Sequence, residues 1–229
     1  MTRRLLAALI FAAAVCVAPA MAQTPPSATE LAAYRGLHAA AAAGDVATIR
    51  RLAVAGDNLD ARDGNGRTPL HVAAFQGHGE AARLLIAIGA KPGLLDDQRY
   101  DAVTIAAVRD DVPVVKALLA TGASAKLITS RYDGTALIAA AHLGHDGVVR
   151  ELIEAGAPLD HVNNLGWTAL MEAVVLGDGG LRHVEAARAL LAAGADRTIA
   201  DRQGITPLQH ARARGYVAMA ELLETAPRR

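Results

Sequence analysis

The sequence of 229 residues contains a single cysteine, Cys16, and few aromatic residues. One cysteine excludes a disulfide framework within the chain and a metal site built from several thiolates. Aromatic residues make up 3% of the chain although 52% of its residues are hydrophobic, so the apolar content is mostly alanine, leucine, valine and isoleucine. This composition favours closely packed helices over a β-sandwich.

No excess of charge is present either, since 23 basic side chains balance 23 acidic ones. A net positive surface is what holds a nucleic-acid backbone, so this balance argues against DNA or RNA as a partner. The uncharged apolar run over residues 5–18 is shorter than the roughly 20 residues that a membrane-spanning helix needs.

The first residues have the organisation of a secretory signal peptide. Two arginines at positions 3 and 4 precede the apolar run, and Ala20-Met21-Ala22 offers the small-x-small pattern that signal peptidase reads. We expect residues 1–22 to be a signal peptide that is cleaved between Ala22 and Gln23. An uncleaved anchor is the alternative, and the paired arginines leave open whether export follows the general or the twin-arginine route.

Cleavage at this point would leave a chain without cysteine, which suits folding in an oxidising compartment. We therefore expect an exported protein in the periplasm of a Gram-negative bacterium, with secretion beyond it as the alternative. Residues 23–29 contain two prolines among small polar residues and are expected to form a flexible spacer.

The rest of the chain repeats itself with a period of about 33 residues. The clearest copy carries the run Thr68-Pro69-Leu70-His71-Val72-Ala73. Its threonine position recurs at Asp101, Thr135, Thr168 and Thr206, its helix-turn glycine at Gly44, Gly77, Gly144, Gly177 and Gly215, and its closing glycine at Gly56, Gly89, Gly122, Gly156 and Gly194. These positions divide residues 30–226 into six repeats, near 30–63, 64–96, 97–129, 130–163, 164–201 and 202–226, and leave a tail over 227–229.

The run from Thr68 to Ala73 resembles the signature of the ankyrin repeat, Thr-Pro-Leu-His-x-Ala. The resemblance implies an all-α ankyrin-repeat solenoid of about six helix-turn-helix repeats joined by short β-hairpin loops. It also implies that His71 ties the ends of neighbouring repeats together. The residues agree with this fold, because Thr68 can cap the first helix, Pro69 suits its first turn and Gly77 can end it in the left-handed conformation.

Two repeats depart from the pattern. The repeat over 97–129 has Asp101 in place of threonine, Asp110 in place of the turn glycine, and a proline at 113 that is tolerated only near the start of a helix. We expect it to be the least regular repeat. The repeat over 164–201 carries an insertion around residues 177–181, which we expect to protrude from the edge away from the hairpins.

No catalytic residue, metal site or cofactor is predicted. Four of the eight histidines, His38, His71, His78 and His145, fall on scaffold positions of the repeat. His142 and His145 could share a metal, but the sequence places no third ligand nearby. The glycine-rich run over 177–180 follows a predicted helix and lacks the Lys-Ser/Thr ending of a phosphate-binding loop. No serine lies in a nucleophile elbow.

The resemblance implies a binding surface instead. In ankyrin proteins the hairpin tips and the exposed face of each first helix form a concave strip that contacts other proteins. The matching residues that we select as the candidate partner-binding site are Arg67, Phe75, Gln76, Arg99, Tyr100, Arg109, Arg131, Tyr132, His142, Leu165 and Trp167. Tyrosine, tryptophan and arginine often dominate binding energy at interfaces, although each ring could also serve to shield the hairpin base.

The function expected from the sequence is that of a non-catalytic protein–protein interaction module. We expect a monomer whose partner is another protein, with no nucleic acid and no membrane bound after cleavage. One alternative is a dedicated regulator of one envelope partner, such as a toxin immunity or inhibitor protein or an accessory factor for an exported enzyme. A carrier of a small molecule or metal is a third class.

Overall fold

The computed structural model describes residues 23–226, in which thirteen helices form. A short helix, α1 (Ala28–Ala33), is followed by six antiparallel helix pairs: α2 (Gly36–Ala43) and α3 (Val46–Val54); α4 (Pro69–Gln76) and α5 (Gly79–Ala87); α6 (Ala102–Val108) and α7 (Val112–Ala120); α8 (Ala136–His142) and α9 (Asp146–Glu154); α10 (Ala169–Val175) and α11 (Leu181–Ala192); α12 (Pro207–Ala213) and α13 (Val217–Thr225). The expected six helix-turn-helix repeats are confirmed. The predicted signal peptide and the tail lie outside the described residues. No helix within residues 23–226 is long and apolar enough to cross a membrane.

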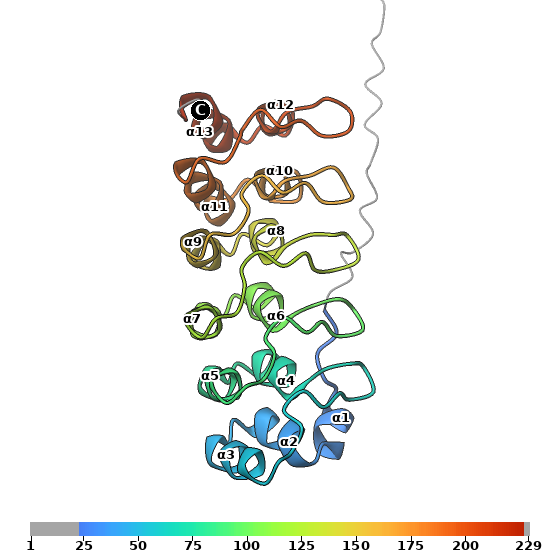
Figure 1. Ribbon diagram of the computed structural model, residues 1–229. Coiled ribbons are helices and arrows are strands. Elements are labelled where there is room, and N and C mark those ends of the chain that lie inside the picture. Colours follow the sequence, from blue (N-terminus) through green and yellow to red (C-terminus); the bar gives the residue numbers. More distant parts are fainter. Residues whose placement is uncertain (1–22, 227–229) are drawn as a thin grey trace, which may run out of the picture.

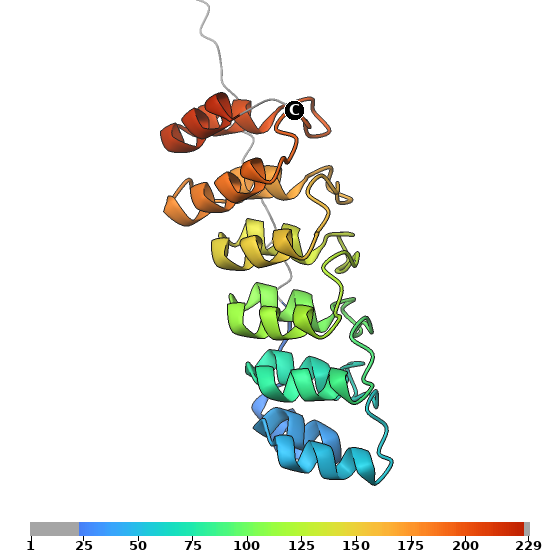
Figure 2. The same cartoon turned by 60° about the vertical axis from the view of Figure 1, so that its left-hand side comes forward.

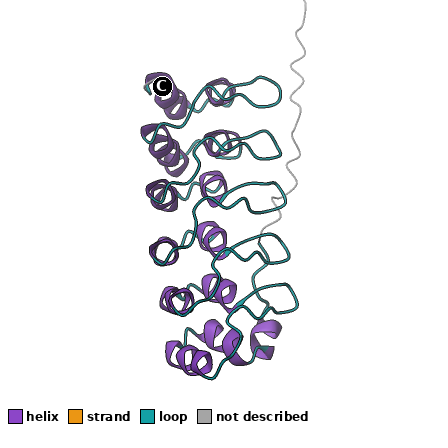
Figure 3. Cartoon of the chain, in the orientation of Figure 1, coloured by secondary structure: helices purple, strands orange, loops and turns teal. Residues whose placement is uncertain are grey.

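The repeats stack into two columns of helices. Figure 1 shows the first helix of each pair in one column, the second helix in the other, and the connecting loops projecting to the side of the first column. Figure 2 shows the loops along one edge of the stack and the turns within the pairs along the opposite edge. Each loop is closed as a hairpin, for example by the Asp63 amide that donates to the Arg67 carbonyl at 2.9 Å. Among residues 23–226 these hairpins contain no named strand (Figure 3).

The first helix of each pair begins where the sequence predicts. The Thr68 hydroxyl accepts the amide of His71, three residues into α4, and Pro69 occupies the first helical turn. Thr135, Thr168 and Thr206 cap α8, α10 and α12 in the same way. A hydroxyl that accepts an otherwise unpaired amide stabilises a helix start by about 1 kcal/mol, which fixes where the first helix begins in these four repeats.

The turn within each pair contains a residue in the left-handed backbone conformation. Gly77 ends α4 with φ 76°, and Gly44, Gly144 and Gly215 have similar values. The expectation that Gly177 takes this role is wrong, because in the turn between α10 and α11 the positive φ falls on Gly179. The insertion lengthens the turn, and α11, at twelve residues, is also longer than the second helices before it.

The core consists of small first helices packed against leucine-rich second helices. Pairs of buried alanines recur in the first helices, at 73–74, 106–107 and 140–141, and let neighbouring helices approach closely. Leu85, Leu118, Leu152 and Leu190 are fully buried in the second column. Each repeat covers the apolar face of the next, so the stability of the array comes from stacking.

Two rows of side chains connect neighbouring repeats through backbone carbonyls. His71 Nδ1 accepts the Thr68 amide at 3.0 Å, so Nε2 carries the proton and donates to the Tyr100 carbonyl, also at 3.0 Å. Burial lowers the pKa of His71 to about 4, which keeps the ring neutral near pH 7. His38 makes the equivalent bond to the Arg67 carbonyl at 3.0 Å. These bonds confirm the connecting role expected for His71.

The second row lies at the turns within the pairs. His78 and His145 contact the Ala42 and Ala107 carbonyls of the preceding repeats at 3.0 and 2.8 Å. In the repeat with the insertion His183 takes this place and contacts the His142 carbonyl at 3.0 Å. Sequence reasoning did not assign His183, because the insertion moves it out of the repeat register.

The repeat over 97–129 is irregular in the way the sequence predicts. Arg99 and Asp110 adopt positive φ values of 65° and 58° without being glycine. Asp101 caps α6 with one carboxylate oxygen, which accepts the Thr104 amide at 2.9 Å and the Thr104 hydroxyl at 2.6 Å. Its other carboxylate oxygen is buried without a hydrogen-bond partner. Burial raises the pKa of the Asp101 carboxyl above its ordinary value of 3.8.

Replacing Asp101 with threonine, the capping residue of four other repeats, is expected to stabilise the protein by about 1–2 kcal/mol at pH 7. The unfolded chain loses the Asp101 proton near pH 3.8, whereas the folded chain holds it to higher pH. The wild type therefore loses stability as the pH rises above 3.8, so the advantage of the variant should grow over that window. Thermal unfolding at several pH values measures this. Thr135→Asp is the converse control and should destabilise the protein, whereas an advantage that is independent of pH would contradict the explanation.

Candidate functional site

The candidate surface follows one side of the stack, where each hairpin meets the first helix after it. At the first hairpin the residue just before the helix cap lies beside the last turn of that helix, since the Arg67 guanidinium is 5.8 Å from the centre of the Phe75 ring. We call this row of positions the strip. Its members in the repeat register are Arg67, Phe75, Tyr100, Val108, His142, Trp167, Val175 and Ile205, with Asn65, Gln98, Tyr132 and Leu165 at the adjoining hairpin tips.

The part of the strip at the first hairpin is shielded from solvent. Arg67 and Phe75 are each only 3% exposed, which corrects the expectation that both lie open to a partner. Arg67 donates to Glu30 Oε1 and to the Thr24 carbonyl, each at 3.0 Å, and lies 3.4 Å from Asp63 Oδ2. A cation so fully withdrawn from water requires these anionic and carbonyl partners.

The segment that closes it is residues 23–30, which we call the strap. The Thr24 amide donates to Gln98 Oε1 at 2.9 Å, and the Asn65 side-chain amide donates to Glu30 Oε1 at 2.6 Å. Ser27 and Glu30 cap α1 reciprocally. In place of the expected flexible spacer over 23–29, the strap therefore has defined contacts with two hairpins. Figure 1 shows it passing from α1 along the hairpin before α4 to the hairpin before α6.

Tyr34, just after α1, adds a further contact at the closed end. Its hydroxyl donates to Asp63 Oδ2 at 2.6 Å. Burial and this bond to a carboxylate raise the pKa of Tyr34 to about 12. Asp63 thus holds both the Tyr34 phenol and the Arg67 guanidinium, so its carboxylate joins the N-terminal segment to the first hairpin.

Over the later repeats the strip is exposed to solvent. Leu165 is 39% exposed and Ile205 37% exposed, and Leu143 beside His142 is 41% exposed. Tyr132 and Trp167 are partly exposed and, unlike Tyr100, do not pack against the core cluster of the described residues. Burial also raises the pKa of the Tyr100 phenol. We call Tyr132, His142, Leu143, Leu165, Trp167 and Ile205 the open strip.

A buried carboxylate lies beneath the open strip. Glu172, on α10, is 3% exposed, and its Oε2 lies 3.2 Å from His142 Nδ1. Its Oε1 accepts the Asn163 side-chain amide at 2.8 Å. Sequence reasoning selected His142 but missed Glu172 and Asn163. The available signal was an acidic residue inside a first helix that is otherwise apolar. Glu172 Oε2 lies within ion-pair distance of His142 and, among the described residues, accepts no hydrogen bond.

The remaining predicted residues lie on the surface around the strip. Arg99 pairs with Asp133 of the next hairpin at 3.1 Å, with both side chains about half exposed. Arg109 and Arg131 are exposed, and Gln76 is partly exposed. An exposed pair of this kind contributes little to stability.

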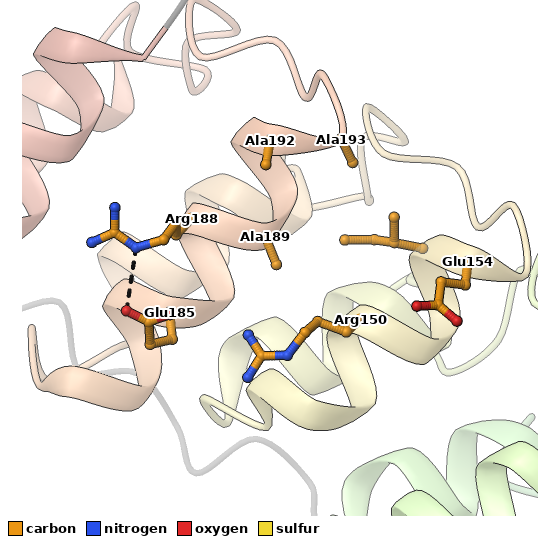
Figure 4. A pocket seen from close by; sticks show the side chains of 8 residues that line it. Arg150, Glu154, Glu185, Arg188, Ala189, Ala192 and Ala193 are labelled. Atoms are coloured by element: carbon orange, nitrogen blue, oxygen red, sulfur yellow. Dashed lines mark hydrogen bonds and ion pairs between the residues drawn. The ribbon is translucent and has the colours of Figure 1, made fainter.

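A further depression lies on the outer face of the stack. A shallow groove of about 360 Å³ lies between α9 and α11, with Arg150, Glu154, Glu185 and Arg188 around an alanine-rich floor (Figure 4). Its charges balance, and Arg188 already pairs with Glu185. Among residues 23–226 no three metal-ligating side chains come together.

Comparisons with known proteins agree on one family. The family model for ankyrin repeats (3 copies) matches residues 37–127 and 103–201. Ankyrin repeat protein YahD of Escherichia coli (strain K12) is 30% identical over 188 residues, covering 82% of this chain and 93% of that protein. An ankyrin repeat domain from Acinetobacter baumannii AYE has a TM-score of 0.78 and 43% identity, covering 84% of this chain and 98% of that one. The ankyrin repeat protein EF0377 has a TM-score of 0.78 and 30% identity, covering 85% and 100%.

Proposed function

Because the chain belongs to the ankyrin-repeat family, we propose that it is a protein-binding module that is exported to the periplasm and holds its partner on the open strip. Ankyrin-repeat domains are generally non-catalytic binding modules, and the similarity to bacterial members covers most of the array. The partner is a protein, bound without cofactor or metal. The chain acts as a monomer that presents one side of the stack.

The assignment of the binding site rests on the exposure of large apolar side chains on the open strip. Leu143, Leu165 and Ile205 come from three successive repeats, and each is more than a third exposed. Trp167 belongs to the same repeat as Leu165 and does not pack against the core cluster of the described residues. Large exposed apolar surfaces mark interaction sites on otherwise polar proteins, which supports a binding role for these side chains.

The scaffold can present the open strip to a partner as a rigid surface. The hairpins are tied to one another, for example by the Ser130 amide donating to the Arg99 carbonyl at 2.7 Å. Because the strip is ordered before a partner arrives, little conformational entropy is lost on binding. A standard interface buries about 800 Å² on each side, which several consecutive repeats can supply.

The proposed export rests on the signal-peptide pattern and on the absence of cysteine after residue 22. The full chain with a C-terminal tag, produced in a Gram-negative host, should be recovered from the periplasmic fraction with Gln23 as its first residue. An envelope protein should be recovered with it after gentle cross-linking. Mass spectrometry of the eluate measures both expectations. Full-length chain retained in the cytoplasm would contradict export, and a tagged chain recovered alone would contradict partner binding.

A further inference from the structure

The strap occupies its site on the hairpins in the way that a bound peptide occupies a groove. We propose that this site receives an extended acidic segment of the partner protein, which replaces residues 23–30. The inference rests on the proposed function, because it adds a second part to the same binding surface. It assigns this part to the residues that now hold the strap, chiefly Arg67, Asn65 and Gln98.

The strap is an extended segment that is held mainly by hydrogen bonds from side chains of the hairpins, with Gln23 and Pro26 buried against the stack. Residues 23–27 form no secondary structure, and α1 has no buried residue. The Gln98 side chain accepts a hydrogen bond from the Thr24 amide at 2.9 Å and donates one to the Thr24 hydroxyl at 3.3 Å. Arg67 donates to the Thr24 carbonyl. Recognition of one backbone amide and one carbonyl by fixed side chains is a form of binding that any extended peptide can satisfy.

The site specifies a carboxylate. Glu30 Oε1 accepts from Arg67 at 3.0 Å and from the Asn65 side-chain amide at 2.6 Å. If the strap left, Arg67 would keep only Asp63, whose Oδ2 already accepts the Tyr34 hydroxyl. A buried guanidinium with a missing partner is costly, so whatever replaces the strap must bring an acidic group to the same position.

The strap is also an imperfect occupant. Gln23 is 8% exposed, and both polar atoms of its side-chain amide are buried without a hydrogen-bond partner. An unpaired buried amide opposes the docking of the strap, and a segment with an apolar side chain at this point would avoid that loss.

The site is continuous with the open strip. The hairpin that carries Gln98 and Arg99 bonds directly to the next one, through the Ser130 amide and the Arg99 carbonyl. That next hairpin carries Tyr132 of the open strip, and Arg99 also pairs with Asp133 there. A partner whose apolar part lies on the open strip can thus extend an acidic segment into the strap site.

The test uses the full chain with Glu30→Lys, in which the strap repels Arg67, and a fluorescein-labelled synthetic peptide of residues 23–34. The peptide should bind this variant about tenfold more tightly than it binds the unaltered chain. The unaltered peptide should also bind the Glu30→Lys chain about tenfold more tightly than a peptide that carries Glu30→Gln. Circular dichroism checks folding, and a Glu30→Gln chain replaces the lysine variant if that one does not fold.

The second arm asks whether the partner uses the same site. Saturating peptide should lower the capture of envelope proteins by the Glu30→Lys chain, and the Glu30→Gln peptide should not. Absence of peptide binding, or binding that does not depend on the carboxylate, would overturn the proposal. Capture that is unchanged by bound peptide would also overturn it and leave the proposed function standing. A chain that binds the peptide but captures nothing would contradict the proposed function instead.

Discussion

Replacing Arg67 with methionine is expected to lower the free energy of unfolding by about 3 kcal/mol, measured by urea unfolding followed by circular dichroism. Methionine can fill the space of the arginine stem but supplies no donor. The variant therefore leaves Asp63 and the Thr24 carbonyl without the guanidinium, and Glu30 keeps only the Asn65 amide and its bonds to Ser27. It also uncovers the Phe75 ring, over which the guanidinium lies. The strap should become accessible to proteases as its contacts are lost.

Arg99→Met is the matched control. Arg99 occupies a hairpin of the next repeat and pairs with Asp133, but both side chains are about half exposed. A solvent-exposed pair contributes at most about 1 kcal/mol, so this variant should unfold close to the wild type. If the two methionine variants lowered stability equally, the difference in burial between Arg67 and Arg99 would not explain their roles.

The fold was predictable because every local signal recurs at a fixed period. Thr68 and its equivalents fix the helix starts, and Gly77 and its equivalents fix most of the turns. The one turn predicted wrongly, at Gly177, lies in the repeat with the insertion, where the period no longer applies. His183 escaped notice for the same reason, since its bond to the His142 carbonyl depends on the longer turn.

The site was less predictable, because it depends on a segment outside the repeat. Composition gave no indication that residues 23–29 dock, since their contacts are made by partners such as Arg67 and Gln98, more than forty residues further along the chain. The strap determines which selected residues stay accessible. Glu172 was missed because a lone acidic residue on a predicted helix is usually a solvated side chain, and only the packing of Asn163 and His142 around it shows otherwise.

The double substitution Leu165→Ala and Trp167→Ala is expected to lower the affinity for the captured envelope partner about a thousandfold. Leu165 is well exposed, and neither residue packs against the core of the described chain, so the helical circular-dichroism signal should stay unchanged. Large side chains at the centre of an interface commonly contribute about 2 kcal/mol or more when truncated. Two such losses account for a change of this size.

The matched control is Leu181→Ala with Val217→Ala. These two side chains are 76% and 67% exposed, and both begin second helices on the edge opposite the hairpins. They therefore remove exposed apolar surface without touching the open strip. The control separates a specific contact from a general loss of hydrophobic surface.

Quantitative affinity capture from an envelope fraction, with the wild type and these two double variants immobilised at equal density, measures where the partner binds. We predict that the wild type and the Leu181/Val217 variant retain the same protein in the same amount, and that the Leu165/Trp167 variant retains almost none. Equal retention by all three folded chains would place the partner elsewhere on the molecule and contradict the assignment of the open strip.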